Sequence, residues 1–170
     1  VYKDNGQFDE AIDSYENAIL KNPDYIEAHY GLAMLYQELG EFNTAIEYLE
    51  KVLSMQPNLA EVHNRLGVVL NELGLLDDAL ISFQQAIAIN PDYSEAHNNL
   101  GNIYKERNEI EKAIEKYLQC LEINSNYLIA LQNFGVCLQT FYFTHKSNIV
   151  DKHIINLLAQ DKILRPVDII

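Results

Sequence analysis

The fold is decided by the stretch Pro91-Asp-Tyr-Ser-Glu-Ala-His-Asn-Asn-Leu-Gly-Asn-Ile-Tyr104, because the chain repeats it. The pattern also occurs 34 residues earlier, in Pro57-Asn-Leu-Ala-Glu-Val-His-Asn-Arg-Leu-Gly-Val-Val-Leu70. It occurs a third time in Pro23-Asp-Tyr-Ile-Glu-Ala-His-Tyr-Gly-Leu-Ala-Met-Leu-Tyr36. A fixed period of this length is typical of proteins built by stacking one repeated helical unit.

Each period predicts two helices. The first starts after the proline, where capping-box-like pairs are expected to satisfy free backbone N–H groups: Asp24 with Glu27, Asn58 with Glu61, and Asp92 with Glu95. It should end at a residue that tolerates positive φ, namely Gly6, Gly40, Gly74 and Asn108. Apolar residues at helical spacing place the second helix at residues 9–21, 43–55, 77–89 and 111–123.

One helix pair cannot bury both of its apolar faces, so the pairs are expected to stack. Small residues should let neighbouring helices approach closely: Ala33, Gly67, Gly101 and Gly135 in the first helices, and Ala45, Ala79 and Ala113 in the second. Larger side chains should fill the space between repeats: Tyr15, Leu49, Phe83 and Tyr117. The sequence therefore predicts an all-α solenoid whose first helices form a concave face.

The pattern His97-x-x-Leu100-Gly101-x-x-Tyr104, followed by Ala113-x-x-x-Tyr117, resembles the tetratricopeptide repeat (TPR) signature. The resemblance implies a right-handed solenoid of antiparallel helix pairs, an α-α superhelix with an irregular C-terminal capping helix. In this frame we expect a partial repeat with a complete second helix at 1–25, repeats at 26–59, 60–93 and 94–127, the first helix of a degenerate repeat at 128–146, and a capping helix with a tail at 147–170. Because the chain starts in mid-repeat, further repeats are expected upstream.

The repeat pattern changes near the C-terminal end. Phe141-Tyr-Phe-Thr-His-Lys146 replaces the expected glycine turn. After it, an apolar stripe at helical spacing predicts the capping helix: Ile149, Val150, His153, Ile154, Leu157 and Leu158. Such a helix would cover the last apolar face of the stack.

Composition and charge exclude several classes of protein. The net charge of −13 arises within residues 1–104, which hold 4 basic and 17 acidic residues, whereas residues 105–170 are neutral. This charge disfavours nucleic acid, anionic membranes and acidic ligands, although it also suits a merely solubilising surface. No apolar run is long enough to span a membrane, and no signal segment is evident. Cys120 and Cys137 lie in apolar helical patterns, which predicts reduced, buried thiols in an intracellular protein, cytoplasmic or nuclear.

The sequence contains no recognisable catalytic or cofactor motif, so we expect a non-enzymatic chain without a cofactor. Three histidines, His29, His63 and His97, align in successive repeats. Neighbouring helices lie about 8–10 Å apart, whereas ligands lie about 2 Å from a shared metal ion, so the three cannot form one metal site. We expect their rings to pack structurally; a pH-sensitive ladder is the alternative.

Several asparagines interrupt the first helices, although asparagine is a poor helix former. An amide offers both a donor and an acceptor, so a row of them can bind the backbone of an extended peptide. The predicted peptide-binding groove comprises Asn64, Arg65, Asn98, Asn99, Asn102, Lys105 and Asn133. The alternative is a polar solvated face, or asparagines that bond between adjacent helices.

The run Glu95-Ala-His-Asn-Asn-Leu-Gly-Asn-Ile-Tyr-Lys-Glu106 resembles the repeats of O-linked N-acetylglucosamine transferases and SPINDLY-type proteins. That resemblance implies an asparagine ladder that holds substrate polypeptide, with Asn99 and Asn133 in the ladder position. It leaves two functions open: a protein–protein interaction module that binds an extended polypeptide or helix, or the substrate-recruiting arm of a glycosyltransferase whose catalytic domain lies outside this chain.

The expected partner is a protein or peptide, neutral or basic rather than acidic, with no nucleic acid or membrane. Self-association through the ends of the array is a further expectation. TPR domains that bind chaperone tails hold a carboxylate with basic residues on three successive first helices. The corresponding residues here are Tyr30, Asn64 and Asn98, and only Arg65 beside them is basic, so this type of ligand is not expected.

Overall fold

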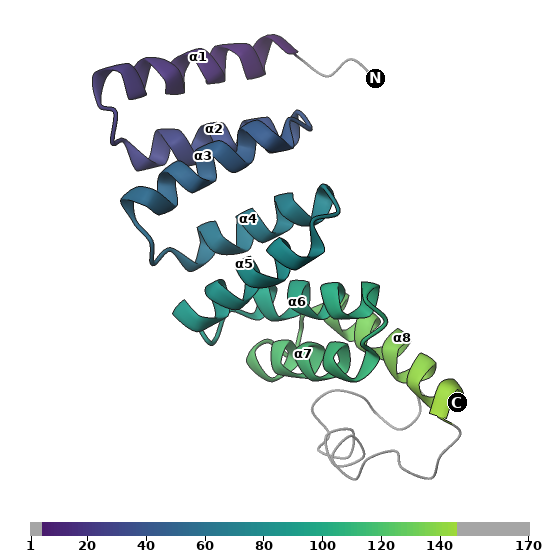
Figure 1. Cartoon of the computed structure of the whole chain (residues 1–170). Coiled ribbons are helices and arrows are strands. Elements are labelled where there is room, and N and C mark those ends of the chain that lie inside the picture. Colours follow the sequence, from purple (N-terminus) through teal and green to yellow (C-terminus); the bar gives the residue numbers. More distant parts are fainter. Residues whose placement is uncertain (1–4, 146–170) are drawn as a thin grey trace. The chain divides into compact units, whose positions relative to one another are not determined.

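A computed structural model of the chain describes residues 5–145, and within them every regular element is an α-helix (Figure 1). The all-α prediction is therefore confirmed. The predicted capping helix and tail at 147–170 lie outside the described residues. The helices are α1 (Asn5–Lys21), α2 (Ile26–Glu38), α3 (Phe42–Met55), α4 (Ala60–Glu72), α5 (Leu76–Ile89), α6 (Ser94–Glu106), α7 (Ile110–Ile123) and α8 (Leu128–His145).

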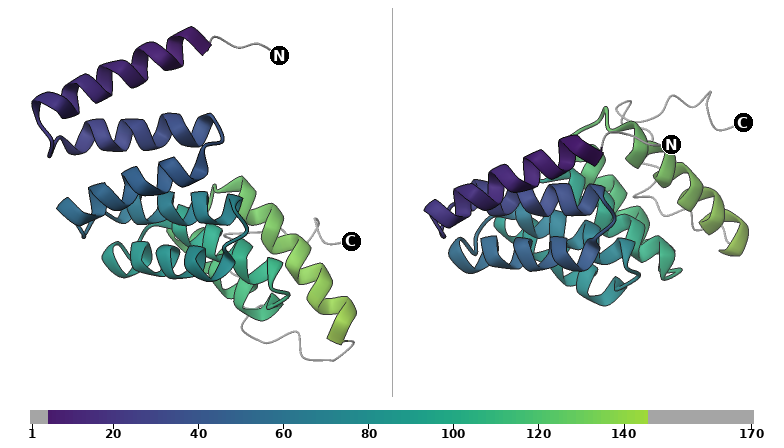
Figure 2. Two further views of the ribbon diagram at one scale, coloured as in Figure 1. Left: turned by 45° about the horizontal axis from the view of Figure 1, so that its top comes forward. Right: turned by 90° about the horizontal axis from the view of Figure 1, so that it is seen from above.

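The helices group into two compact units. The first unit, Val1–Pro91, contains α1 to α5, and the second, Asp92–Ile170, contains α6 to α8. Within a unit, helices that follow one another in sequence pack together, and short turns make them antiparallel (Figure 2). Helices α2, α4, α6 and α8 are the first helices of the predicted repeats, and α1, α3, α5 and α7 are the second helices.

The turns within the helix pairs have the predicted backbone conformation. Gly40, Gly74 and Asn108 have φ angles of 78°, 73° and 58°, which confirms the prediction of positive φ. The expected helix end at Gly6 is wrong, because α1 starts at Asn5 and contains it. A glycine within a helix costs only about 1 kcal/mol, and no helix precedes α1 in the described residues from which the chain would have to turn.

The predicted N-cap residues of the capping boxes, Asp24, Asn58 and Asp92, are also wrong. Helices α2, α4 and α6 have Tyr25, Leu59 and Tyr93 as N-caps, and none of these makes a side-chain capping bond. Asp24 instead lies in the turn before the helix, where its backbone N–H donates to Asn22 Oδ1 over 3.3 Å. The proline and the residue after it are used by this turn, so the helix starts later than the sequence pattern suggested.

The aligned histidines support these turns. His29 Nε2 donates to the carbonyl of Pro23 over 2.8 Å, and His63 Nε2 donates to that of Pro57 over 2.9 Å. The rings of His29 and His97 are buried. A structural role is therefore confirmed for His29 and His63, which fasten the first helix to the loop that precedes it.

Glycines let the helices of a pair approach closely. A Cβ atom on Gly67 would lie 2.7 Å from Phe83 Cε1, and one on Gly101 would lie 2.7 Å from Tyr117 Cε1. These two rings therefore pack within a helix pair. The predicted packing between repeats is also observed, since Tyr15 on α1 lies against Gly31 on α2 and Tyr117 shares a buried cluster with Phe134 on α8. Gly135 does not fit the prediction of close approach, because a Cβ there would meet no described atom within 4 Å.

Cys120 and Cys137 are free and buried, as predicted. Burial raises the pKa of the Cys120 thiol to about 11. It also raises the pKa of Cys137, although the charge of Lys105 acts in the opposite direction. No helix in the described part of the chain is both long and apolar enough to cross a membrane.

Candidate functional site

The seven predicted groove residues divide between the two units. Asn64 and Arg65 lie on α4 in the first unit, whereas the other five lie on α6 and α8 in the second. Two of the seven are not available to a partner, because Asn64 is 2% exposed and Asn98 is 3% exposed. For these two, the expectation of an open polar face is wrong, since their side chains face neighbouring helices and not solvent.

The second unit brings three predicted residues together in one network. Lys105 Nζ on α6 donates to Asn133 Oδ1 on α8 over 3.2 Å. Asn133 Nδ2 donates in turn to Asn102 Oδ1 on α6 over 3.1 Å. The same oxygen accepts a bond of 2.7 Å from the hydroxyl of Tyr117 on α7. All three helices of this unit therefore hold the cluster, which we call the amide network: Asn102, Lys105, Tyr117 and Asn133.

Tyr117 is a site residue that the sequence pattern does not predict. The pattern predicts a space-filling side chain, yet the Tyr117 ring packs on Gly101 while its hydroxyl donates to Asn102. Burial raises its pKa, which keeps the hydroxyl protonated and able to donate. The sequence does contain a signal, because Phe83 occupies the equivalent position one repeat earlier and Tyr117 differs from it by a hydroxyl group.

The directions of these bonds are fixed by chemistry. An ammonium group can only donate, so Asn133 must turn its oxygen toward Lys105. Its nitrogen then faces Asn102, which must present its own oxygen. This leaves Asn102 Nδ2 without a partner in the described residues, and the atom is not buried. The network therefore offers N–H donors to an incoming molecule.

Asn98 and Asn99 form a separate and weaker contact. Asn98 Nδ2 donates to Asn99 Oδ1 over 3.4 Å, near the upper limit for a hydrogen bond. Asn98 Oδ1 is buried and has no partner among the described residues. Asn99 is half-buried and lies one helical turn before Asn102 and its neighbours. Of this pair, only Asn99 remains a candidate for contact with a partner.

In the first unit, Arg65 lies in a cluster with a tyrosine and a glutamate. The hydroxyl of Tyr30 on α2 donates to Glu61 Oε1 on α4 over 2.9 Å. Burial raises the pKa of Tyr30, and the bond to Glu61 raises it further, whereas the nearby Arg65 acts in the opposite direction. Glu61 thus bonds across repeats and does not cap its own helix. Because Glu61 lies beside it, Arg65 is not an isolated positive charge.

Apolar side chains lie on α8 on either side of Asn133. Ile129 is 59% exposed and Val136 is 57% exposed. They lie four residues before and three residues after Asn133, which places all three on one face of the helix. The amide network is therefore bordered by aliphatic surface.

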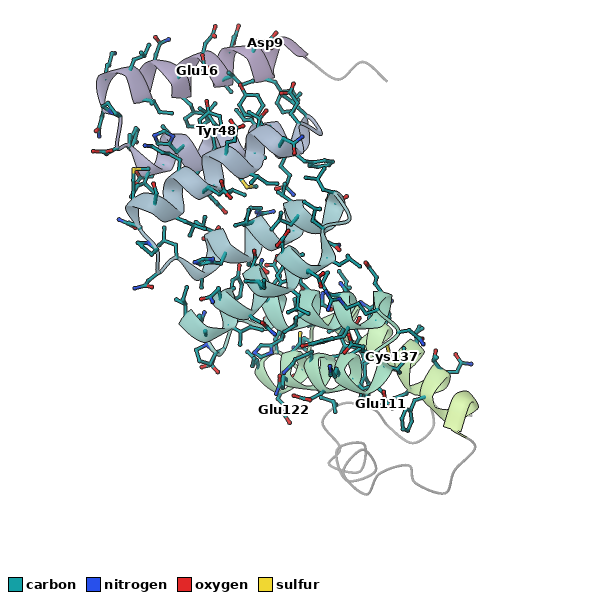
Figure 3. The ribbon with its side chains drawn as sticks, viewed as in Figure 1. Asp9, Glu16, Tyr48, Glu111, Glu122 and Cys137 are labelled. Atoms are coloured by element: carbon teal, nitrogen blue, oxygen red, sulfur yellow. The ribbon has the colours of Figure 1, made fainter. Side chains whose placement is uncertain are left out.

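The described residues contain no group of three or more metal-ligating side chains. The acidic side chains of Glu111 and Glu122 on α7 are exposed, and Figure 3 shows them with Cys137 on α8.

Two family models match the sequence, and both are described as tetratricopeptide repeat. One matches residues 2–64 and the other matches residues 58–126. No curated protein matches the sequence. The match to solved structures is broad, with 365 chains, so likeness of fold does not by itself select a partner.

One similar structure is a crystal structure of MamA, which is 27% identical. The match covers 94% of this chain and 93% of MamA, with a TM-score of 0.75. MamA from Desulfovibrio magneticus RS-1 is 22% identical over 92% of this chain and 89% of that chain, with a TM-score of 0.74. The first TPR of Spaghetti (RPAP3), bound to the HSP90 peptide SRMEEVD, is 19% identical over 68% of this chain and 92% of that chain, with a TM-score of 0.66. The last two matches show the fold alone.

Proposed function

Because the chain belongs to the tetratricopeptide repeat family, we propose that it is a non-enzymatic protein-interaction module that binds an extended polypeptide on the face formed by α6 and α8. The amide network is the observation that carries this proposal. Three helices hold it in place by side-chain bonds of 2.7 to 3.2 Å. A network that is already ordered loses little conformational entropy when a partner binds.

An extended polypeptide matches what the network offers. Its backbone presents a carbonyl oxygen at every residue, and such oxygens accept bonds from amide and ammonium donors. Asn102, Asn133 and Lys105 supply these donors, and Asn99 lies beside them. Recognition through the backbone would tolerate variation in the side chains of the partner.

The fold is compatible with this function. The RPAP3 domain, which shares only the fold, is bound to a peptide in its solved structure. The net charge of −13 favours partners that are neutral or basic. The comparisons give no support to the substrate-recruiting arm of a glycosyltransferase, so we place the function in binding alone.

The proposal is tested by capture of polypeptides on the immobilised chain, with identification by mass spectrometry. A triple variant (Asn99→Ala, Asn102→Ala and Asn133→Ala) should lose the captured set. It also loses the two bonds that Asn133 makes and the one from Tyr117, at about 1 kcal/mol each, so the thermal midpoint should fall by several degrees without loss of the fold.

The control is Asn126→Ala, since this exposed residue in the turn before α8 lies outside the network. It should capture the same polypeptides as the original chain. An unchanged set of captured polypeptides in the triple variant would place the binding surface elsewhere.

A further inference from the structure

The hydrogen-bond directions in the amide network indicate the chemistry of the partner; this inference rests on the function proposed above. We infer that the α6–α8 face selects a proline-rich segment in extended conformation, bound through its carbonyl oxygens and its rings. Such a segment supplies acceptors and apolar surface but few backbone N–H groups.

The amide network has hydrogen-bonding groups that its internal bonds leave unused. Asn102 Oδ1 already accepts two bonds, from Tyr117 and Asn133, and so has no capacity left. Asn133 Oδ1 accepts one bond, from Lys105, and keeps one acceptor position. The donors that remain are the amide N–H groups of Asn102 and the second N–H of Asn133, together with the ammonium hydrogens of Lys105. Donors therefore outnumber acceptors at this face.

An ordinary peptide would lose hydrogen bonds between its backbone N–H groups and water at this site. An ordinary backbone presents an N–H for each carbonyl, and an N–H that docks against a surface of donors gives up its bond to water without a replacement. A buried donor without a partner costs about 1–3 kcal/mol. Proline has no N–H, so a proline segment avoids this cost while keeping every carbonyl.

An aliphatic surface on α8 lies beside the donors. Ile129 and Val136 are more than half exposed and share a face of α8 with Asn133. The pyrrolidine rings of a polyproline helix are apolar, and its backbone is already extended before binding. The rings can therefore cover the aliphatic surface while the carbonyls meet the donors.

A carboxylate would also accept these bonds. Only one of the donor groups, the Lys105 ammonium, is charged, however, and residues 105–170 carry no net positive charge that would attract an acidic segment. The neutral acceptor is therefore the better complement.

The test titrates the full chain, with backbone resonances followed by NMR, against three blocked peptides: decaproline, a Gly-Ser decapeptide and decaglutamate. Asn102→Asp is the decisive variant. Its carboxylate can still accept from both Tyr117 and Asn133, so the network stays intact, but the group facing outward changes from a donor to an acceptor. Asn126→Asp makes the same change of charge at an exposed site outside the network.

The expected result is that decaproline binds at least tenfold more tightly than either other peptide and shifts resonances of α6 and α8. Asn102→Asp should weaken this binding at least tenfold and leave the thermal midpoint almost unchanged, whereas Asn126→Asp should leave both unchanged.

Preference for decaglutamate or for the Gly-Ser peptide would overturn the inference, and so would equal binding of decaproline by Asn102→Asp. In each case the proposed function would still stand if the triple alanine variant loses its captured polypeptides. If that variant captures the same set as the original chain, the proposed function fails as well.

Discussion

Asn102 shows how one side chain can serve both structure and binding. Its oxygen accepts bonds from α7 and α8 and so holds three helices together, while its nitrogen remains outside the network. Asn98, four residues earlier on the same helix, has the same amide but is almost completely buried. Residue type therefore does not decide between the two roles; the position relative to neighbouring helices does.

Glycines give a matched pair of predictions at the residue scale. Gly67→Ala should destabilise the fold by about 1–3 kcal/mol, because its Cβ would lie 2.7 Å from the ring of Phe83. Gly135→Ala should stabilise α8 by up to about 1 kcal/mol, because alanine favours the helix and no described atom lies within 4 Å of the new Cβ. Urea unfolding followed by circular dichroism measures both. Equal effects of the two substitutions would contradict the close helix approach at Gly67.

At the scale of elements, α7 packs against both of the other described helices of its unit, α6 and α8. Its buried side chains include Ala113, Tyr117 and Cys120, all at 0% exposure. This enclosure explains both the donor role of the Tyr117 hydroxyl and the raised pKa of the Cys120 thiol.

The buried thiol on α7 predicts a loss of stability at high pH. The pKa of Cys120 is raised to about 11 in the folded chain, so its contribution is fully present below the pKa of the unfolded thiol and is lost as pH rises through the folded value. The loss should approach roughly 2–3 kcal/mol, from a shift of about two pH units. Urea midpoints measured between about pH 8 and pH 11 test this.

Cys120→Ala is the control for this pH dependence. It should show a shallower fall in stability, with the remainder due to the other groups whose pKa values burial raises: Cys137 and the tyrosines Tyr30, Tyr36, Tyr48, Tyr117 and Tyr127. An identical slope in the variant would mean that the thiol does not contribute.

At the scale of the whole molecule, the acidic excess is the dominant property. Residues 1–104 carry the entire net charge of −13. Like charges on one chain repel one another and oppose the compact state, and dissolved salt screens this repulsion.

The thermal midpoint should therefore rise by a few degrees when NaCl increases from about 0.05 M to about 0.5 M. Differential scanning fluorimetry at neutral pH provides the measurement. Binding of decaproline, which is uncharged, should change little over the same range. A midpoint that falls with salt would show that attractive ion pairs outweigh the repulsion.

The sequence by itself determined the helices and their order. A period of 34 residues places core residues such as Leu32, Leu66 and Leu100 at the same point of each helix pair. The turns at Gly40, Gly74 and Asn108 follow from the few residue types that accept positive φ. These are local properties, so they can be read from local pattern. The errors at the capping boxes and at Gly6 concern the ends of helices, where the alternatives differ by only about 1 kcal/mol.

Only the tertiary structure decided which asparagines lie in the amide network and which are buried. Asn98, Asn102 and Asn133 look alike in the sequence, but their surroundings come from helices that are up to 31 residues away along the chain. The direction of each hydrogen bond depends on Lys105 and Tyr117, which donate to the side-chain oxygens of Asn133 and Asn102. These contacts form only after α6, α7 and α8 have packed. A hydrogen bond joins atoms about 3 Å apart, so the sequence pattern cannot predict these partners, which come together only in the folded chain.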